Sequence, residues 1–244
     1  MKKIAFFVEG QTEQFFLNKL LIEIAGVKNV NILLKKFKGR GRPTEDIVPK
    51  SLAQGTIEVQ HTVLIYDCGG DESVKTRILE EYSGLTADGY TEIIGFRDLY
   101  PLPISGLPKL TQRLKNGLTI NGRIVEEALP SDTTSIIIAV REIEDWFLAE
   151  CNHYTCIDTN LVLNETQITK LGFNPRIDNL TVRSTAAAED LRDVYKIVGK
   201  TYNKSKDKIE KTVECLDYAN LYLEVRRKMD KLDELITKID NFLT

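Results

Sequence analysis

The stretch IAFFVEGQTE at residues 4–13 decides which fold this sequence predicts. Its first five residues are apolar, which is typical of a strand buried on both faces, and the strand ends at an acid, Glu9. Further along, TVLIYDCGGD at residues 62–71 repeats the arrangement and ends its apolar run at Asp67. Strands buried on both faces belong to parallel sheets, whose carboxyl ends meet at one edge. The two stretches therefore predict an α/β fold with acids gathered at that edge.

Apolar patterning predicts five strands with helices between them. The strands are expected at 4–8, 30–37, 61–66, 91–96 and 135–140. The helices are expected at 12–24, 43–54 and 72–82, and in pieces around 109–129. Strands that alternate with helices form βαβ units with right-handed crossovers. The fold class is thus α/β, with a Rossmann-like, mostly parallel sheet and a helical C-terminal region.

The character of the sequence changes near residue 150, where strand-like runs end and helix-forming residues begin to dominate. We therefore predict an α/β domain over 1–150 and a helical domain over 151–244. In the last segment, apolar residues recur alternately four and three apart, as in a heptad stripe on one helix face. The stripe consists of Tyr218, Tyr222, Val225, Met229, Leu232, Ile236, Ile239 and Leu243. Docking onto the chain's own core is the default for this stripe, and a homodimer through the C-terminal helix is the alternative.

The composition is that of an ordinary globular protein. The 244 residues are 42% apolar and 28% charged, and the net charge of −3 argues against a protein that coats nucleic acid non-specifically. No apolar run approaches the roughly 20 residues that span a membrane, so no membrane partner is expected. The four cysteines lack a framework spacing and favour a reducing, cytoplasmic setting. Cys151, His153 and Cys156 lie close together, but no second pair completes a zinc site, so packing roles are expected.

The candidate site is the group of acids that follows the first and third strands. Asp67 is the expected metal ligand, with Asp71 as a weaker one. Glu9 is expected to bind metal or act as a general base, and Glu13, one helical turn on, to be a catalytic or second-metal carboxylate. Clustered carboxylates repel each other, and oxygen ligands favour Mg²⁺ or Mn²⁺. As alternatives, Glu13 is an exposed acid in a first helical turn and Asp71 a helix cap.

The last strand, SIIIAV at 135–140, also runs into acids. If that strand continues, Glu142 and Glu144 lie on alternate faces, so only one is expected to point inward. Glu142 is favoured as a catalytic carboxylate, and Glu144 is the candidate metal ligand. Trp146 and Phe147, which follow, are expected to be core anchors.

Basic residues crowd the segment KKFKGRGR at 35–42, which can neutralise several phosphates. The candidates for nucleic-acid contact are Lys36, Lys38, Arg40, Arg42, Lys109 and Arg141. A solvated strand edge and loop is the alternative interpretation of the segment.

The order of these motifs resembles the TOPRIM domain, the metal-binding module of topoisomerases, bacterial primases and certain nucleases. The resemblance is carried by the EGxTE turn at 9–13 and by the strand that ends at Asp67. The block REIEDWF at 141–147 is similar to one in small bacterial TOPRIM-like proteins, which resemble nucleases of the overcoming-lysogenisation-defect type. The resemblance covers about residues 1–150. It implies a metal-dependent nuclease in phage defence, working with a separate ATPase partner.

One position departs from the TOPRIM pattern, which usually has Asp-x-Asp after the second strand. Here Gly69 stands in place of the second acid, so its role passes to Asp71, Glu142 or Glu144. The leading interpretation is a Mg²⁺- or Mn²⁺-dependent nuclease that cuts DNA or RNA. The alternative, motivated by Gly69, is a binding or regulatory subunit with an inactive metal site. A hydrolase of small phosphoesters that uses the same acids stays a third possibility. Because the chain has no GxxxxGK[ST] loop, any ATPase would be another chain.

Overall fold

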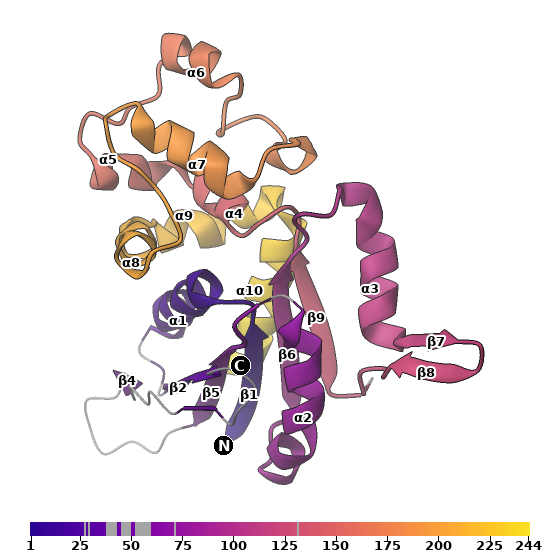
Figure 1. Cartoon of the computed structure of the whole chain (residues 1–244). Coiled ribbons are helices and arrows are strands. Elements are labelled where there is room, and N and C mark those ends of the chain that lie inside the picture. The colour runs from indigo at the N-terminus through magenta and orange to yellow at the C-terminus, as the bar shows by residue number, and fades with distance from the viewer. Residues whose placement is uncertain are drawn as a thin grey trace. The chain divides into compact units, whose positions relative to one another are not determined.

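The computed structural model describes residues 1–26, 28, 30–37, 43–44, 50–51, 60–70, 72–130 and 132–244. The chain forms two compact units (Figure 1). Unit 1 consists of residues 1–97, 106–138 and 237–244, and unit 2 of residues 98–105 and 139–236. The block at 141–147, which the sequence division placed in the first domain, therefore belongs to unit 2.

A parallel five-stranded sheet forms the centre of unit 1 and confirms the predicted fold class. Its order is β2–β5–β1–β6–β9, and β6 and β9 each end one residue into unit 2. The strands are β1 (Lys2–Val8), β2 (Val30–Phe37), β5 (His61–Asp67), β6 (Glu92–Asp98) and β9 (Thr134–Ala139). In the centre of the sheet, Val8 of β1 lies opposite Asp67 of β5 on one side and Phe96 of β6 on the other. All five strands were predicted to within two residues at each end.

Two helices connect these strands in opposite directions, α1 (Gln11–Ala25) and α2 (Ser73–Ala87). The first leads from β1 toward β2, and the second leads from β5 across β1 to β6. Right-handed crossovers in opposite directions place the two helices on opposite faces of the sheet. Val74 and Ile78 of α2 pack with Phe7 of β1 in one buried cluster. The direction of the helical connections reverses between β1 and β5. Open α/β sheets usually bind ligands at such a reversal.

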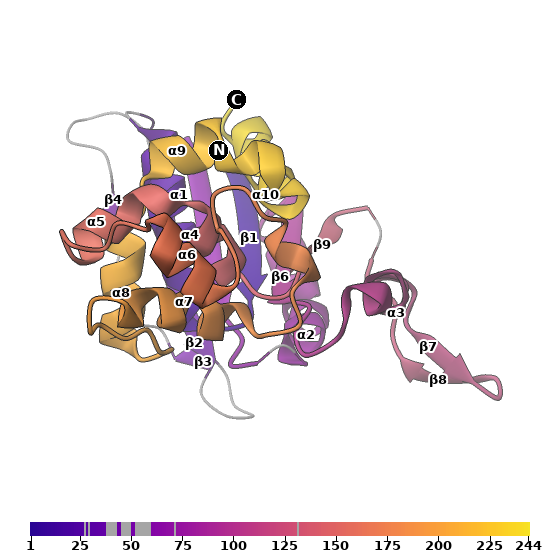
Figure 2. The ribbon, with the colours of Figure 1, turned by 90° about the horizontal axis from the view of Figure 1, so that it is seen from above.

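One predicted helical segment is wrong where the structure describes it, and another is confirmed only in part. Pro43–Thr44 (β3) and Lys50–Ser51 (β4) are extended and pair antiparallel with β2. Within 109–129, α3 (Leu107–Asn116) is helical, but a hairpin of two short strands follows it. These strands are β7 (Leu118–Ile120) and β8 (Arg123–Glu126). Figure 2 shows this hairpin extending away from the sheet of unit 1.

The turn of this hairpin explains the error. Asn121 and Gly122 both have positive φ, 49° and 76°. An Asn-Gly pair with two positive φ angles is the preferred turn between twisted antiparallel strands. The dipeptide therefore reverses the chain between β7 and β8, in a segment where the sequence prediction expected helix.

Unit 2 is mainly helical. Its helices are α4 (Glu144–Ala149), α5 (Tyr154–Ile157), α6 (Glu165–Leu171), α7 (Ala187–Lys196), α8 (Lys206–Cys215), α9 (Tyr218–Leu223) and the start of α10 (Asp230–Leu243). Trp146 and Phe147 of α4 are 2% and 0% exposed, so both anchor the core as expected. None of the helices in the described residues is both long and apolar enough to cross a membrane.

The C-terminal heptad stripe does not lie on one continuous helix. A 3₁₀ turn at Val225–Lys228 separates α9 from α10, so the expected single helix is wrong. Most of the stripe is nevertheless buried within the chain, as the docking interpretation expects, including Tyr218, Met229, Leu232 and Ile239. The homodimer stays a prediction.

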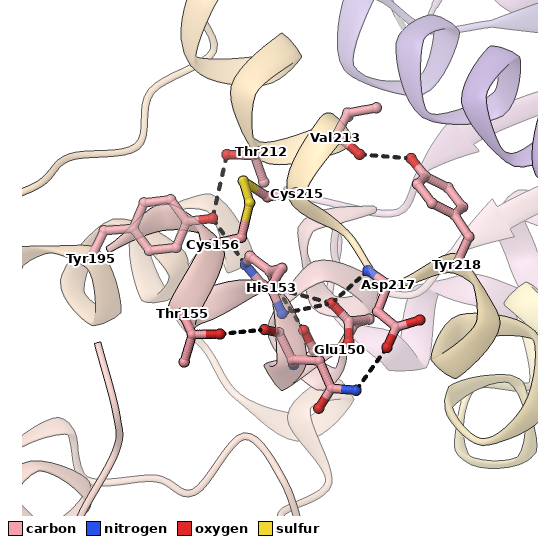
Figure 3. Close-up of a disulfide and its surroundings, with 11 residues drawn as sticks. Glu150, His153, Thr155, Cys156, Tyr195, Thr212, Val213, Cys215, Asp217 and Tyr218 are labelled. Atoms are coloured by element: carbon pink, nitrogen blue, oxygen red, sulfur yellow. Dashed lines mark hydrogen bonds and ion pairs between the residues drawn. A yellow bond between two sulfur atoms is a disulfide. The ribbon is translucent and has the colours of Figure 1, made fainter. Parts of the chain in front are cut away.

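A disulfide joins Cys156 of α5 to Cys215 of α8 in unit 2 (Figure 3). The two cysteines are 59 residues apart, and their spacing does not predict the pairing. The bond runs against the reducing setting that the cysteine spacing favoured. The bond removes Cys156 from any zinc site. The ring nitrogens of His153 contact Glu150 and Tyr195 instead, so His153 has the packing role expected, whereas the disulfide of Cys156 was not predicted.

Candidate metal centre

Three buried acids converge in unit 2: Asp98, Glu142 and Glu144. One carboxylate oxygen of each lies within 4.8 Å of the others. Their exposed fractions are 3%, 6% and 0%. Across the part of the chain that the structure describes, this acidic triad is the one group of three or more ligating side chains with such spacing.

The backbone between β9 and α4 explains why two glutamates so close in sequence reach one site. The strand ends at Ala139, and Arg141 takes a positive φ of 61°, which is uncommon for a residue with a side chain. The chain therefore turns and enters α4 at Glu144 instead of continuing as a strand. Glu142 and Glu144 consequently do not alternate between two faces, and the expectation that only one points inward is wrong.

Backbone donors hold two of the acids in place. Asp98 ends β6 and accepts a hydrogen bond of 3.0 Å from the backbone N–H of Ile143. Glu142 accepts one of 2.9 Å from the N–H of Ala188, in the first turn of α7. A carboxylate is favoured at the start of a helix because the unpaired N–H groups there carry partial positive charge. These bonds orient the two carboxylates before any ligand binds.

Glu144 is the most deeply buried member of the triad. Its Oε1 atom accepts a hydrogen bond of 2.8 Å from the hydroxyl of Tyr202. Its Oε2 atom is buried and has no hydrogen-bond partner among the described residues. Burial raises the pKa of Glu144, and repulsion from Glu142 adds to the rise while Lys204 opposes it. A buried carboxylate oxygen without a partner is costly, so it is available to a cation.

Lys204 brings a positive charge into the triad from the connection between α7 and α8. Its Nζ atom lies 3.0 Å from Glu142, 3.4 Å from Glu144 and 3.9 Å from Asp98. The Lys204 side chain is 44% exposed, and its ammonium group lies at the buried acids. With all four groups ionised, three negative charges and one positive charge leave a net charge of −2. The ammonium thus offsets only part of the repulsion.

The triad fits a hard divalent cation. Oxygen ligands on opposite sides of Mg²⁺ are about 4 Å apart, and those around Ca²⁺ about 5 Å. The three carboxylate oxygens lie within 4.8 Å of one another, close enough to share one such ion. Because the donors are carboxylates alone, Mg²⁺ or Mn²⁺ suits them better than zinc. Three protein ligands would also leave coordination positions for water or a substrate.

The acids predicted from the first and third strands lie in unit 1. The ends of β1 and β5 are adjacent, as expected: the N–H of Gly70 donates to the carbonyl of Glu9 at 2.8 Å. Asp67 is 1% exposed and lies 3.1 Å from Lys36 Nζ, in an ion pair without hydrogen-bond geometry. Its Oδ1 atom accepts the N–H of Gly69 at 2.9 Å. A metal at Glu9 and Asp67 stays a prediction.

The structure tests one of the two remaining predicted site acids, Glu13, but not the other, Asp71. Glu13 is 3% exposed and accepts a hydrogen bond of 2.9 Å from the N–H of Gly10 at the start of α1. The contact matches the first-turn position of the alternative for Glu13, but the burial of the side chain contradicts the exposure that this alternative expected. Asp71 lies outside the described residues.

The candidates for nucleic-acid contact are dispersed. Lys38, Arg40 and Arg42 lie outside the described residues, and Lys109 is exposed on α3. Lys36 pairs with Asp67, as described above. Arg141 is 5% exposed and binds two buried aspartates, a geometry that favours a structural role over contact with phosphate.

Sequence reasoning missed Asp98, although a signal for it exists. The strand EIIGFRD at 92–98 ends at an acid, like the runs before Glu9 and Asp67, although Arg97 separates the acid from the apolar residues. The predicted strand stopped two residues short, at Phe96, and so excluded the acid.

Comparison of the chain with models of known protein families, with curated proteins and with solved structures finds no match.

Proposed function

We propose that this protein is a divalent-metal-dependent hydrolase of phosphodiester bonds, that is, a nuclease acting on DNA or RNA. The observation that carries the proposal is the convergence of Asp98, Glu142 and Glu144, with one buried oxygen of Glu144 left without a partner. These three residues would hold Mg²⁺ or Mn²⁺. When bound, such an ion activates water and neutralises charge on a phosphodiester under attack.

The resemblance to TOPRIM proteins supports the same chemistry. Its motifs place Glu9 and Asp67 at the reversal point of the sheet in unit 1, where ligands commonly bind. The resemblance also implies a nucleic-acid partner, a role in phage defence and a separate ATPase that controls the nuclease. These three elements of the proposal rest on the resemblance alone.

Lys204 favours a second candidate function, a binding or regulatory subunit without metal chemistry. Its ammonium group already contacts all three acids, where a metal ion would otherwise neutralise them. In a catalytic site the metal must displace this ammonium, which the exposed side chain of Lys204 allows. In an inactive site the ammonium would stay, and added metal would change nothing.

Metal binding and cleavage by the purified protein would separate the two functions. Calorimetric titration with Mn²⁺ should show one saturable site in the wild type and none in the double variant Glu142→Gln/Glu144→Gln. Glutamine keeps an oxygen that can accept the hydrogen bonds described above but removes both charges. The matched control, Glu165→Gln/Glu210→Gln, removes two exposed acids from the same unit and should bind Mn²⁺ like the wild type.

Cleavage of plasmid DNA and of transfer RNA should follow metal binding in the same proteins. Cutting that needs Mg²⁺ or Mn²⁺ and is lost in Glu142→Gln/Glu144→Gln would support the nuclease. A third variant, Lys204→Met, should bind Mn²⁺ more tightly than the wild type because the competing ammonium is gone. Absence of Mn²⁺ binding in both the wild type and Lys204→Met would reject the metal site.

A further inference from the structure

A pocket in unit 2 concentrates positive charge. Three lysines line it, Lys200 from the connection between α7 and α8, and Lys208 and Lys211 from α8 itself. The pocket contains about 270 Å³ of empty space, including its open mouth. Lys208 and Lys211 are three residues apart on one helix face, so their ammonium groups repel each other unless an anion lies between them.

Two of the three ammonium groups have no ion-pair partner among the described residues. Asp158 lies 3.6 Å from Lys200 and pairs with it. The described residues provide no ion-pair partner for the ammonium group of Lys208 or Lys211. Acids are present elsewhere on α8, but they do not pair with these two lysines, whose ammonium groups are therefore available to an anion.

Two buried hydroxyl groups also line the pocket, those of Tyr195 and Thr212, which are 2% and 1% exposed. Figure 3 shows the Tyr195 hydroxyl between Thr212 and His153, at 3.3 Å from Thr212 Oγ1 and 2.9 Å from His153 Nε2. Nδ1 of the same histidine lies 3.2 Å from Glu150 Oε2. Tyr195 donates its one hydroxyl proton to Thr212 Oγ1, so Thr212 is held in place and keeps its own proton for a ligand. A hydroxyl donor beside ammonium groups can bind phosphate oxygens.

The disulfide connects two walls of the pocket. Cys156 precedes the lining residue Ile157 on α5, and Cys215 lies one turn after Thr212 on α8. The covalent link limits how far the two helices can separate. A site whose walls are already held in place loses less entropy when a ligand binds.

We propose that this pocket binds a phosphate group, either free inorganic phosphate or the terminal phosphate of a nucleotide. Three lysines and the Thr212 hydroxyl supply donors to such an anion. None of the three acids of the triad lines the pocket, so the proposal does not depend on the metal chemistry above.

Calorimetric titration of the full chain with sodium phosphate, AMP and adenosine would test the proposal. We expect saturable binding of phosphate or AMP at one site and no binding of adenosine. Equal affinities for phosphate and AMP would identify the ion as the ligand, and tighter binding of AMP would identify the nucleotide. Adenosine that binds as well as AMP, or no binding of any of the three, would overturn the proposal.

Two charge-matched variants locate the site. Lys208→Gln/Lys211→Gln should weaken binding about tenfold or more, since charge-assisted hydrogen bonds are lost. Lys196→Gln/Lys206→Gln removes the same charge from two exposed lysines of α7 and α8 that do not line the pocket, and should bind like the wild type. Equal losses in both variants, with unchanged circular dichroism, would show general electrostatic attraction and reject the pocket.

Discussion

Replacement of Arg141 by leucine should destabilise unit 2, because this arginine is the centre of a buried ion-pair network. Its guanidinium donates to Asp145 at 2.9 and 2.5 Å and to Asp190 at 2.9 and 3.0 Å. The side chains of the three residues are 6%, 1% and 5% exposed, respectively. Asp190 also accepts two hydrogen bonds from Arg183. Asp145 receives no side-chain hydrogen bond from another described residue in this network.

The expected loss of stability depends on which ion-pair partners each aspartate keeps in the variant. In Arg141→Leu, Asp145 would be a buried charge without a partner, whereas Asp190 would keep Arg183. Breaking one side of a buried ion pair costs about 3–5 kcal/mol. The control Arg183→Leu removes a side chain that is 24% exposed and leaves Asp190 paired with Arg141. It should cost about 1–2 kcal/mol.

The loss should also depend on pH. Burial raises the pKa of Asp145 to about 6, although Arg141 opposes the rise. Without Arg141 the pKa should rise further, and a protonated Asp145 carries no unpaired charge. The proton then binds the folded state more tightly than the unfolded state, so the variant regains stability as the pH falls. The difference in the free energy of unfolding between the wild type and Arg141→Leu should therefore shrink as the pH falls from 7 to 5.

Urea denaturation followed by circular dichroism at both pH values would measure these free energies. A loss of less than about 1 kcal/mol for Arg141→Leu at pH 7 would refute the structural role, because it lies below the range for a broken buried pair. The nucleic-acid role expected from the sequence makes a different prediction. Unchanged stability together with weaker nucleic-acid binding would show that Arg141 contacts phosphate.

Three further predictions concern single positions. Gly117→Ala should lower the free energy of unfolding by about 1–3 kcal/mol, because the residue has a φ of +73° and an added Cβ would clash with the backbone oxygen of Glu126. In the control Gly84→Ala, in α2, the added Cβ meets no other atom, and the variant should be more stable by about 0.5–1 kcal/mol. Equal melting temperatures of these two variants would contradict the clash. Asp217→Ala should cost about 1 kcal/mol at pH 7, because this residue caps α9 at 3.0 Å. That cap hydrogen bond lowers the Asp217 pKa, so urea titrations should show the difference disappearing as the pH falls through the lowered value. Burial raises the pKa of Cys151 to about 11, so maleimide labelling of the native protein should be slow at pH 7 and faster at pH 9, and fast labelling at pH 7 would contradict this.

Local patterns in the sequence determined most of the sheet. The apolar runs that end at Glu9 and Asp67 predicted two strands of one parallel sheet, and the parallel register of β1 with β5 confirms this. That the two strands are neighbours was not predicted. Such runs are informative because strands covered on both faces need apolar side chains at nearly every position. The helix predicted from Pro43 shows the limit of the approach, since its described residues pair with β2. Pairing with a distant strand can override a local helical preference.

Only the tertiary structure decided which distant residues meet. Asp98 joins Glu142 and Glu144 because β6 and β9 end in the same region, although 44 residues separate Asp98 from Glu142. Cys156 meets Cys215 across 59 residues for a similar reason, the packing of α5 against α8. Periodicity and capping record the interactions of a residue with its near neighbours along the chain. Contacts between remote residues depend on the direction of every turn between them, such as the positive φ at Arg141, and no local pattern in this sequence specifies that.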